Sequence, residues 1–220
     1  MRPALLIAAL LSAPAPAADW VAKVVPDTPP LDALTKPVRA ALGKDAIEVR
    51  DAAGKPVVTV WLVPKFPVRA TAEQAKNGLT AREIPPGTLV GAARFPAAFT
   101  DYRKQDVPAG VYTLRTAIQP ETGDHAGTAP HGEFLLLTPA GDDVVVDPVE
   151  ADDLVKRSKP AAGGDHPAVV LLWPRPGKPH APSIVSKPGG VKVLCVARPA
   201  DGAAGTLGLG LTVAGHSATR

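Results

Sequence analysis

Cysteine and methionine are almost absent from this chain of 220 residues, which has one of each. The single Cys195 cannot form a disulfide within the chain, so stability must come from a packed core, which a chain of this length can build. A blue-copper site is excluded, because it needs a histidine soon after the cysteine and commonly a methionine ligand. Cys195 alternates with Val191, Val193 and Ala197. We therefore expect it to be inert, on the buried face of a strand.

Aromatic residues are also scarce, at 4% of the chain, and the formal net charge is only +3. Nucleic-acid binding usually relies on a dense basic surface with interleaved aromatic side chains. We therefore expect no nucleic-acid partner. After the N-terminal region, the sequence lacks a run of about 18 apolar residues, the length that indicates a transmembrane helix. The mature chain is therefore expected to have no membrane span, and its partners stay unknown.

Sequence signatures of catalysis are missing as well. A Gly-x-Ser-x-Gly nucleophile turn does not occur. The glycines of 205–210 lie in a strand-like run with no helix after them, unlike a phosphate-binding loop. The acidic pairs Asp142–Asp143 and Asp152–Asp153 are interpreted as a hairpin turn and a solvated helix surface, and neither defines a glycosidase site. The sequence therefore favours a protein that is not an enzyme.

The N-terminus of the chain has the pattern of an export signal. Arg2 precedes an apolar run at 4–11, and the small residues Ala15 and Ala17 flank Pro16 just after it. A positive start, a short apolar run and a small-x-small site are typical of a secretory signal peptide. We expect residues 1–17 to be removed after Ala17. The mature protein is then exported, to the periplasm or the extracellular space.

The 26 prolines and 20 glycines fall between short apolar runs, which is typical of turns in an ordered all-β protein. We expect an immunoglobulin-like or jelly-roll-like antiparallel β-sandwich with one or two short helices. Residues 18–44 are assigned to an N-terminal linker and short helix, and residues 45–220 to a single β-sandwich domain. A second helix is expected over 148–159, with Asp147 as its N-cap and Gly163 beyond its end. The expected strands are 46–50, 57–63, 88–93, 110–117, 133–137, 144–146, 168–173, 183–186, 191–197 and 206–213.

Three aromatic residues have structural interpretations. Tyr112 follows Gly110 in a pattern that resembles the tyrosine corner of β-sandwiches, in which the hydroxyl bonds to upstream backbone. Trp61 and Trp173 each end a strong apolar run, so we expect them in the core. Carbohydrate binding is a further hypothesis, which would require Trp20, Trp61 or Trp173 at the surface.

Several motifs lie between Thr88 and Val169. They are Gly91–Arg94, Pro108–Arg115, Gln119–Pro120, Gly123–Pro130, Phe134–Leu137 and His166–Ala168. In these motifs, which span about half of the mature chain, the sequence resembles a family of uncharacterised exported bacterial proteins of planctomycete and acidobacterial type. The resemblance implies kinship and no particular activity. In those relatives, the position of His131 resembles a tyrosine. The resemblance therefore implies that His131 has no essential role.

The tripeptide Gly-Asp-His occurs twice, at 123–125 and at 164–166. If both loops lie at one end of the sandwich, their imidazoles and carboxylates would suit a divalent metal such as zinc. The candidate metal ligands are Asp124, His125, His131, Asp165 and His166. The alternative is structural, since aspartate and glycine form turns and histidine can bond to loop backbone. No standard metal-binding spacing is present, which favours the structural alternative.

Taken with the export signal, these patterns predict a non-catalytic binding or structural module outside the cytoplasm. The alternative is a metal-binding protein or metal-dependent hydrolase that uses the two Gly-Asp-His loops. No catalytic or cofactor-binding residue is assigned, and the only cofactor considered is the divalent metal.

Overall fold

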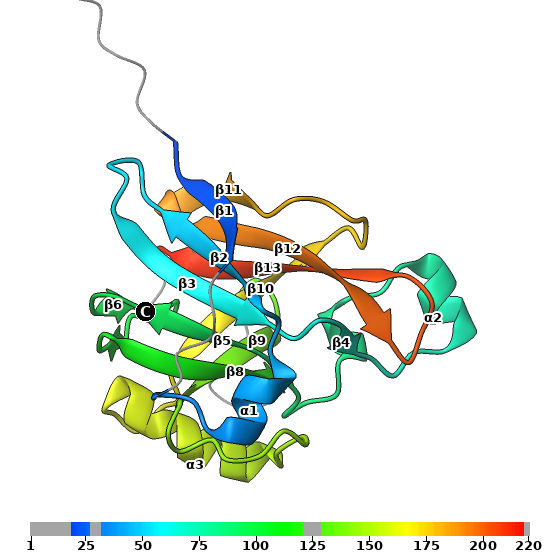
Figure 1. Cartoon of the computed structure of the whole chain (residues 1–220), viewed down its shortest axis with the longest axis horizontal. Helices are drawn as coiled ribbons and strands as arrows, with labels where there is room; N and C mark the ends of the chain where they lie inside the picture. The colour runs from blue at the N-terminus through cyan, green and yellow to red at the C-terminus, as the bar shows by residue number, and fades with distance from the viewer. Residues whose placement is uncertain (1–18, 27–31, 121–128, 218–220) are drawn as a thin grey trace, which may run out of the picture.

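One large β-sheet dominates the fold (Figure 1). The structure is a computed structural model that describes residues 19–26, 32–120 and 129–217. Neighbouring strands along the sheet are antiparallel. In sheet order the strands are β1 (Val21–Pro26), β2 (Asp45–Arg50), β3 (Pro56–Leu62), β5 (Leu89–Phe95), β8 (Gly110–Ile118), β9 (Glu133–Pro139), β10 (Val169–Arg175), β13 (Thr206–Ala214), β12 (Lys192–Asp201) and β11 (Ser183–Ser186).

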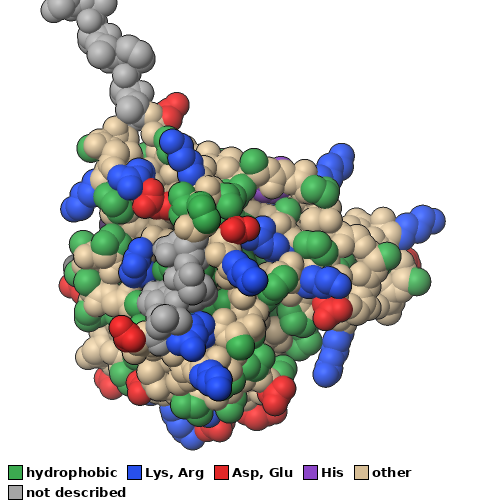
Figure 2. Space-filling view, in the orientation of Figure 1, with side chains coloured by type: hydrophobic (Ala, Val, Ile, Leu, Met, Phe, Trp, Pro, Cys, Tyr) green, Lys and Arg blue, Asp and Glu red, His purple; other side chains and the backbone are tan. Residues whose placement is uncertain are grey.

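Smaller elements decorate this sheet. Strand β4 (Phe66–Pro67) pairs in parallel with β12, and β6 (Phe99–Thr100) pairs with β7 (Asp106–Val107) in a separate hairpin. The helices of the described ranges are α1 (Lys36–Ala41), α2 (Ala72–Asn77) and α3 (Ala151–Ala162), with two 3₁₀ turns at Ala81–Glu83 and Pro188–Gly190. None of these helices has the length and apolar character needed to cross a membrane. On the face shown in Figure 2, basic and acidic side chains are interspersed.

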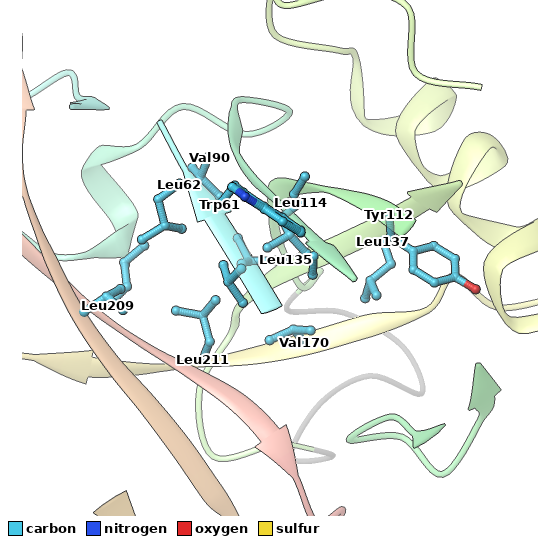
Figure 3. Packing of buried hydrophobic residues seen from close by; sticks show 14 of the residues in the cluster. Trp61, Leu62, Val90, Tyr112, Leu114, Leu135, Leu137, Val170, Leu209 and Leu211 are labelled. Atoms are coloured by element: carbon cyan, nitrogen blue, oxygen red, sulfur yellow. The ribbon is translucent and has the colours of Figure 1, made fainter. Parts of the chain in front are cut away.

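The large sheet coils until its two edge strands, β1 and β11, lie against each other (Figure 1). Strand twist accumulates across a sheet of this width, so its two halves turn toward each other. Figure 3 shows the result: Leu209 and Leu211 of β13 face Trp61, Leu114 and Leu135 of the other half. The main core therefore lies between two halves of one sheet. The predicted all-β, sandwich-like fold is confirmed.

Individual core predictions are also confirmed. Trp61 and Cys195 are fully buried. The hydroxyl of Tyr112 donates a hydrogen bond of 2.9 Å to the carbonyl oxygen of Pro108, which is the upstream contact expected of a tyrosine corner. Because Tyr112 also packs in the core, this bond fixes the start of β8 against the interior.

The N-terminal segment contains the predicted short helix, as α1, but its first residues are a strand where a linker was predicted. Residues 21–26 form β1, which pairs with β2 in the register Ala22↔Val49. Its side chains follow no alternation of buried and exposed positions, because β1 lies at the edge of the sheet. The alternation that identifies a strand in a sequence is therefore missing here.

The acidic pair at 142–143 is not a simple hairpin turn. Asp142 is exposed, but the Asp143 side chain is fully buried against the guanidinium of Arg115. Arg115 donates two hydrogen bonds to this carboxylate, 2.7 Å from Nε to Oδ2 and 3.0 Å from Nη2 to Oδ1. Thr113 donates a third, at 2.6 Å. These three hydrogen bonds, from two residues of β8, hold the Asp143 side chain in the interior.

This ion pair also reshapes the segment that follows it. Arg115 donates to the carbonyl oxygens of Val145 and Asp147, so residues 144–146 form no strand and their three valine side chains stay exposed. The N–H of Val149 donates to the carbonyl oxygen of Gly87, which ties the segment before α3 to the turn that precedes β5. Helix α3 consequently begins at Ala151 with Glu150 as N-cap, and not with Asp147 as predicted.

Candidate ligand pocket on the outer face of the sheet

A second apolar cluster lies on the face of the sheet opposite the main core. Successive strand residues point to opposite faces, so Leu135 and Leu137 enter the main core while Phe134 and Leu136 point outward. Val169 of β10 is adjacent to Leu136 and belongs to the same outer cluster. These outward side chains are buried. An apolar outer face of this kind must be shielded from water by another part of the chain.

Helix α3 covers part of that face. The hydroxyl of Ser158 donates a 2.6 Å hydrogen bond to the carbonyl oxygen of Leu137, which anchors the helix on β9. Leu154 packs into the outer cluster, and Val155 lies beside it, partly exposed. Beyond this helix, the cover is incomplete and a cavity of about 300 Å³ is left. Its lining residues are Arg103, Ala117, Ile118, Gln119, Pro120, Phe134, Leu136, Val155, Lys159, Asp165, His166, Pro167 and Val169.

The Gly-Asp-His loop at 164–166 lies at this cavity because of how α3 ends. Gly163 adopts the left-handed conformation (φ 62°) and its N–H donates to the carbonyl oxygen of Pro160. A glycine in this conformation is the usual end of a helix, as the sequence predicted. The chain then turns back toward β10, and Asp165 and His166 line the cavity, both exposed.

On the opposite rim of the cavity, a buried aspartate fixes the loop that carries Arg103. The carboxylate of Asp101 accepts hydrogen bonds of 2.8–3.0 Å from the backbone N–H groups of Arg103, Gln105 and Val169. The side chain of Gln105 donates both to this carboxylate and to the carbonyl oxygen of Pro167. Burial raises the pKa of Asp101, while these hydrogen bonds lower it. The 101–105 loop is therefore fastened directly to the segment that follows His166.

The described ligand candidates do not gather into one site. His131 lies two residues before β9 and His166 three residues before β10, and these strands are antiparallel neighbours. The two histidines are therefore at opposite ends of the pair, and they line two different cavities. One zinc ion cannot bind both, because its nitrogen ligands lie about 2.0–2.1 Å away.

The rest of the metal hypothesis stays a prediction. Asp124 and His125 lie outside the described residues. Among the residues that the structure does describe, no group of three or more histidine, cysteine, aspartate or glutamate side chains is placed to hold a metal ion. Asp165 and His166 thus share the rim of an apolar cavity with no third described ligand.

His131 lines a different cavity, of about 320 Å³, together with Trp173 and the ion-paired side chains of Arg82 and Glu133. The rings of His131 and Trp173 meet edge to face, with centroids 5.0 Å apart. Lys187 lies 4.9 Å from the Trp173 ring centroid. Trp173 is half-buried, whereas the sequence predicted that it lies in the core. With His131 and Lys187 already on its ring, Trp173 is a poor platform for a sugar.

We expect His131 to make stability depend on pH. Burial lowers its pKa from the usual 6.5, and the charge of Lys187 lowers it further, against the opposing effect of Glu133. The unfolded chain therefore binds the proton first as pH falls, so the free energy of unfolding decreases below about pH 6.5. Urea unfolding near pH 8 and near pH 5 measures the decrease. It should be smaller in His131→Gln than in wild type and in the control His180→Gln, and equal decreases in all three would contradict this expectation.

Sequence reasoning missed most of the cavity. Phe134 and Leu136 looked like ordinary core residues, since an apolar run does not reveal which face is incompletely covered. Arg103 and Lys159 are surface cations in the sequence, with no motif around them. The one available signal was Ile118, a large apolar residue just beyond the expected strand, which is 47% exposed.

Comparisons with protein-family profiles, with curated proteins and with solved structures each find no match to this chain.

Proposed function

We propose that this chain is an exported, non-catalytic binding module that holds a small, largely apolar molecule in the cavity between α3 and the outer face of the sheet. The observation that carries the proposal is the cavity itself. Phe134, Leu136 and Val169 form an apolar floor, and Ile118 and Val155 form apolar walls. Binding sites for small molecules are typically concave and apolar, with a few polar groups at defined positions.

The size of the cavity limits the ligand. At about 30 Å³ per non-hydrogen atom, 300 Å³ accommodates about ten such atoms. A ligand of that size binds with a Kd of about 0.1–1 mM when it gains about 0.5 kcal/mol per atom. Binding is proposed over catalysis because apolar residues make up most of the described lining. Export is proposed from the pattern of residues 2–17, and N-terminal sequencing of the exported protein should find Ala18 first.

Titration calorimetry with 1-octanol tests the proposal. Wild type should bind one octanol, and Ala117→Trp should not, because Ala117 lines the cavity on the same face as Phe134. Ala53→Trp is the matched control, since Ala53 is exposed in the β2–β3 turn. Binding should also survive dialysis against a chelator. Failure of wild type to bind octanol, or equal binding by Ala117→Trp, would contradict the proposed function.

A further inference from the structure

Two cationic side chains lie at the mouth of the candidate cavity. Arg103 comes from the β6–β7 loop and Lys159 from the last turn of α3, and both line the cavity above the apolar floor. Neither side chain forms an ion pair within the described part of the protein. Among the described lining residues, Asp165 is the one carboxylate and His166 the other ionisable group. Two cations thus face one anion beside an apolar cavity.

The position of Arg103 is fixed by its loop. Its backbone N–H donates to the buried carboxylate of Asp101, and the next residue, Lys104, has a φ of +67°. Among described residues other than glycine, Lys104 alone has a positive φ. Such a conformation is unfavourable for a side-chain-bearing residue and persists only when surrounding contacts hold it. The Asp101 hydrogen bonds supply those contacts, so the backbone that carries Arg103 is held in one conformation.

Among the described residues, the carboxylate of Asp101 forms no ion pair with Arg103 or Lys159. It is buried behind the loop and accepts four hydrogen bonds, from three backbone N–H groups and the Gln105 side chain. Its acceptor positions are therefore occupied by the protein. A guanidinium and an ammonium that lie beside apolar surface offer charge-assisted hydrogen bonds to an anionic group. An apolar molecule with one anionic end complements both parts of the cavity at once.

We infer that the cavity takes a free amphiphilic carboxylate of about ten non-hydrogen atoms, with its apolar part on Phe134 and Leu136 and its carboxylate between Arg103 and Lys159. This inference rests on the proposed function, because it names the ligand class of the same site. The size favours a free acid over a bilayer phospholipid, whose acyl chains exceed the cavity.

Calorimetry with three matched probes tests the charge: octanoate, 1-octanol and octylamine, near pH 8 and at low salt. Octanoate should bind wild type at least about tenfold more tightly than octanol, and octylamine more weakly than either. The preference for octanoate should shrink in about 0.5 M NaCl, because salt screens exposed charges. Vesicles of dioleoylphosphatidylglycerol should not bind the protein.

Variants test whether Arg103 and Lys159 cause the preference for octanoate. The double variant Arg103→Gln/Lys159→Gln should bind octanol as wild type does but should lose the tenfold preference for octanoate. Lys156→Gln is the control, since Lys156 lies on α3 with an exposed side chain and outside the cavity lining. It should keep the preference.

The outcomes separate the two proposals. Octanol and octanoate binding with equal affinity would overturn the anion inference and leave the proposed function standing. Tighter binding of octylamine, or an unchanged preference in the double variant, would also overturn the inference. Binding to the vesicles in place of octanoate would show that the anion is a lipid headgroup, against the inference. If none of the three probes binds, both proposals fail.

Discussion

Replacing Asp143 by alanine is expected to lower the free energy of unfolding by about 3–5 kcal/mol, because it leaves a buried guanidinium without its counter-charge. The side chains of Asp143 and Arg115 are both fully buried. Arg157 lies farther away, with Nη1 4.0 Å from the Asp143 carboxylate, and it loses the same counter-charge. Urea unfolding of the purified variant measures the change. The exposed neighbour provides the control: Asp142→Ala should change stability by less than about 0.5 kcal/mol.

A double variant separates the charge from the space that it fills. Arg115→Met/Asp143→Leu removes both charges and keeps much of the buried volume, so it should be more stable than Asp143→Ala. It should not restore wild-type behaviour fully, because Arg115 also donates to the carbonyl oxygens of Gly87, Val145 and Asp147. A loss below about 1 kcal/mol in Asp143→Ala would show that the ion pair does not hold this region.

The second large effect is expected at Gly87, which joins the same network. Its φ is +79°, and a Cβ atom added there would lie 1.9 Å from the carbonyl oxygen of Val149. The Gly87 carbonyl accepts hydrogen bonds from Val149 and from Arg115, so the backbone cannot move apart without breaking them. Gly87→Ala should therefore lower the free energy of unfolding by about 3–5 kcal/mol, from the clash and the lost bonds together.

Gly54 is a matched control for this substitution. It has the same φ of +79°, but an added Cβ would have no neighbouring atom within 4 Å. Gly54→Ala should therefore show only the cost of placing alanine in this conformation, about 1–2 kcal/mol. The difference between the two variants in urea unfolding measures the clash alone. Equal losses would mean that the Val149 segment moves aside freely.

These two predictions concern a network that sequence reasoning could not find. Arg115 falls in the expected strand 110–117, but its position there did not show whether it faced solvent. Its partner Asp143 is 28 positions away and follows an exposed aspartate that suits a turn. Adjacent acidic residues look alike in a sequence. Only the packing of β8 beneath the 143–147 segment decides that one is buried and the other exposed.

The same reasoning applies to the candidate site. The turn residues at 164–166 and the end of α3 at Gly163 followed from local chemistry, and the structure places both beside the cavity. The proposed grouping with His131 did not follow, since it depends on where the ends of β9 and β10 lie. Arg103 could be placed at the same mouth only by the Asp101 hydrogen bonds, which join segments about 68 residues apart.

The sequence by itself determined the all-β class, the tyrosine corner at Tyr112 and the burial of Trp61 and Cys195, because each depends on short-range periodicity or turn chemistry. Only the tertiary structure decided that one sheet coils onto itself, that Asp143 is buried and that the outer face keeps an open cavity. Each of these depends on which distant segments cover which face, and a local pattern records that a face is apolar without recording what covers it.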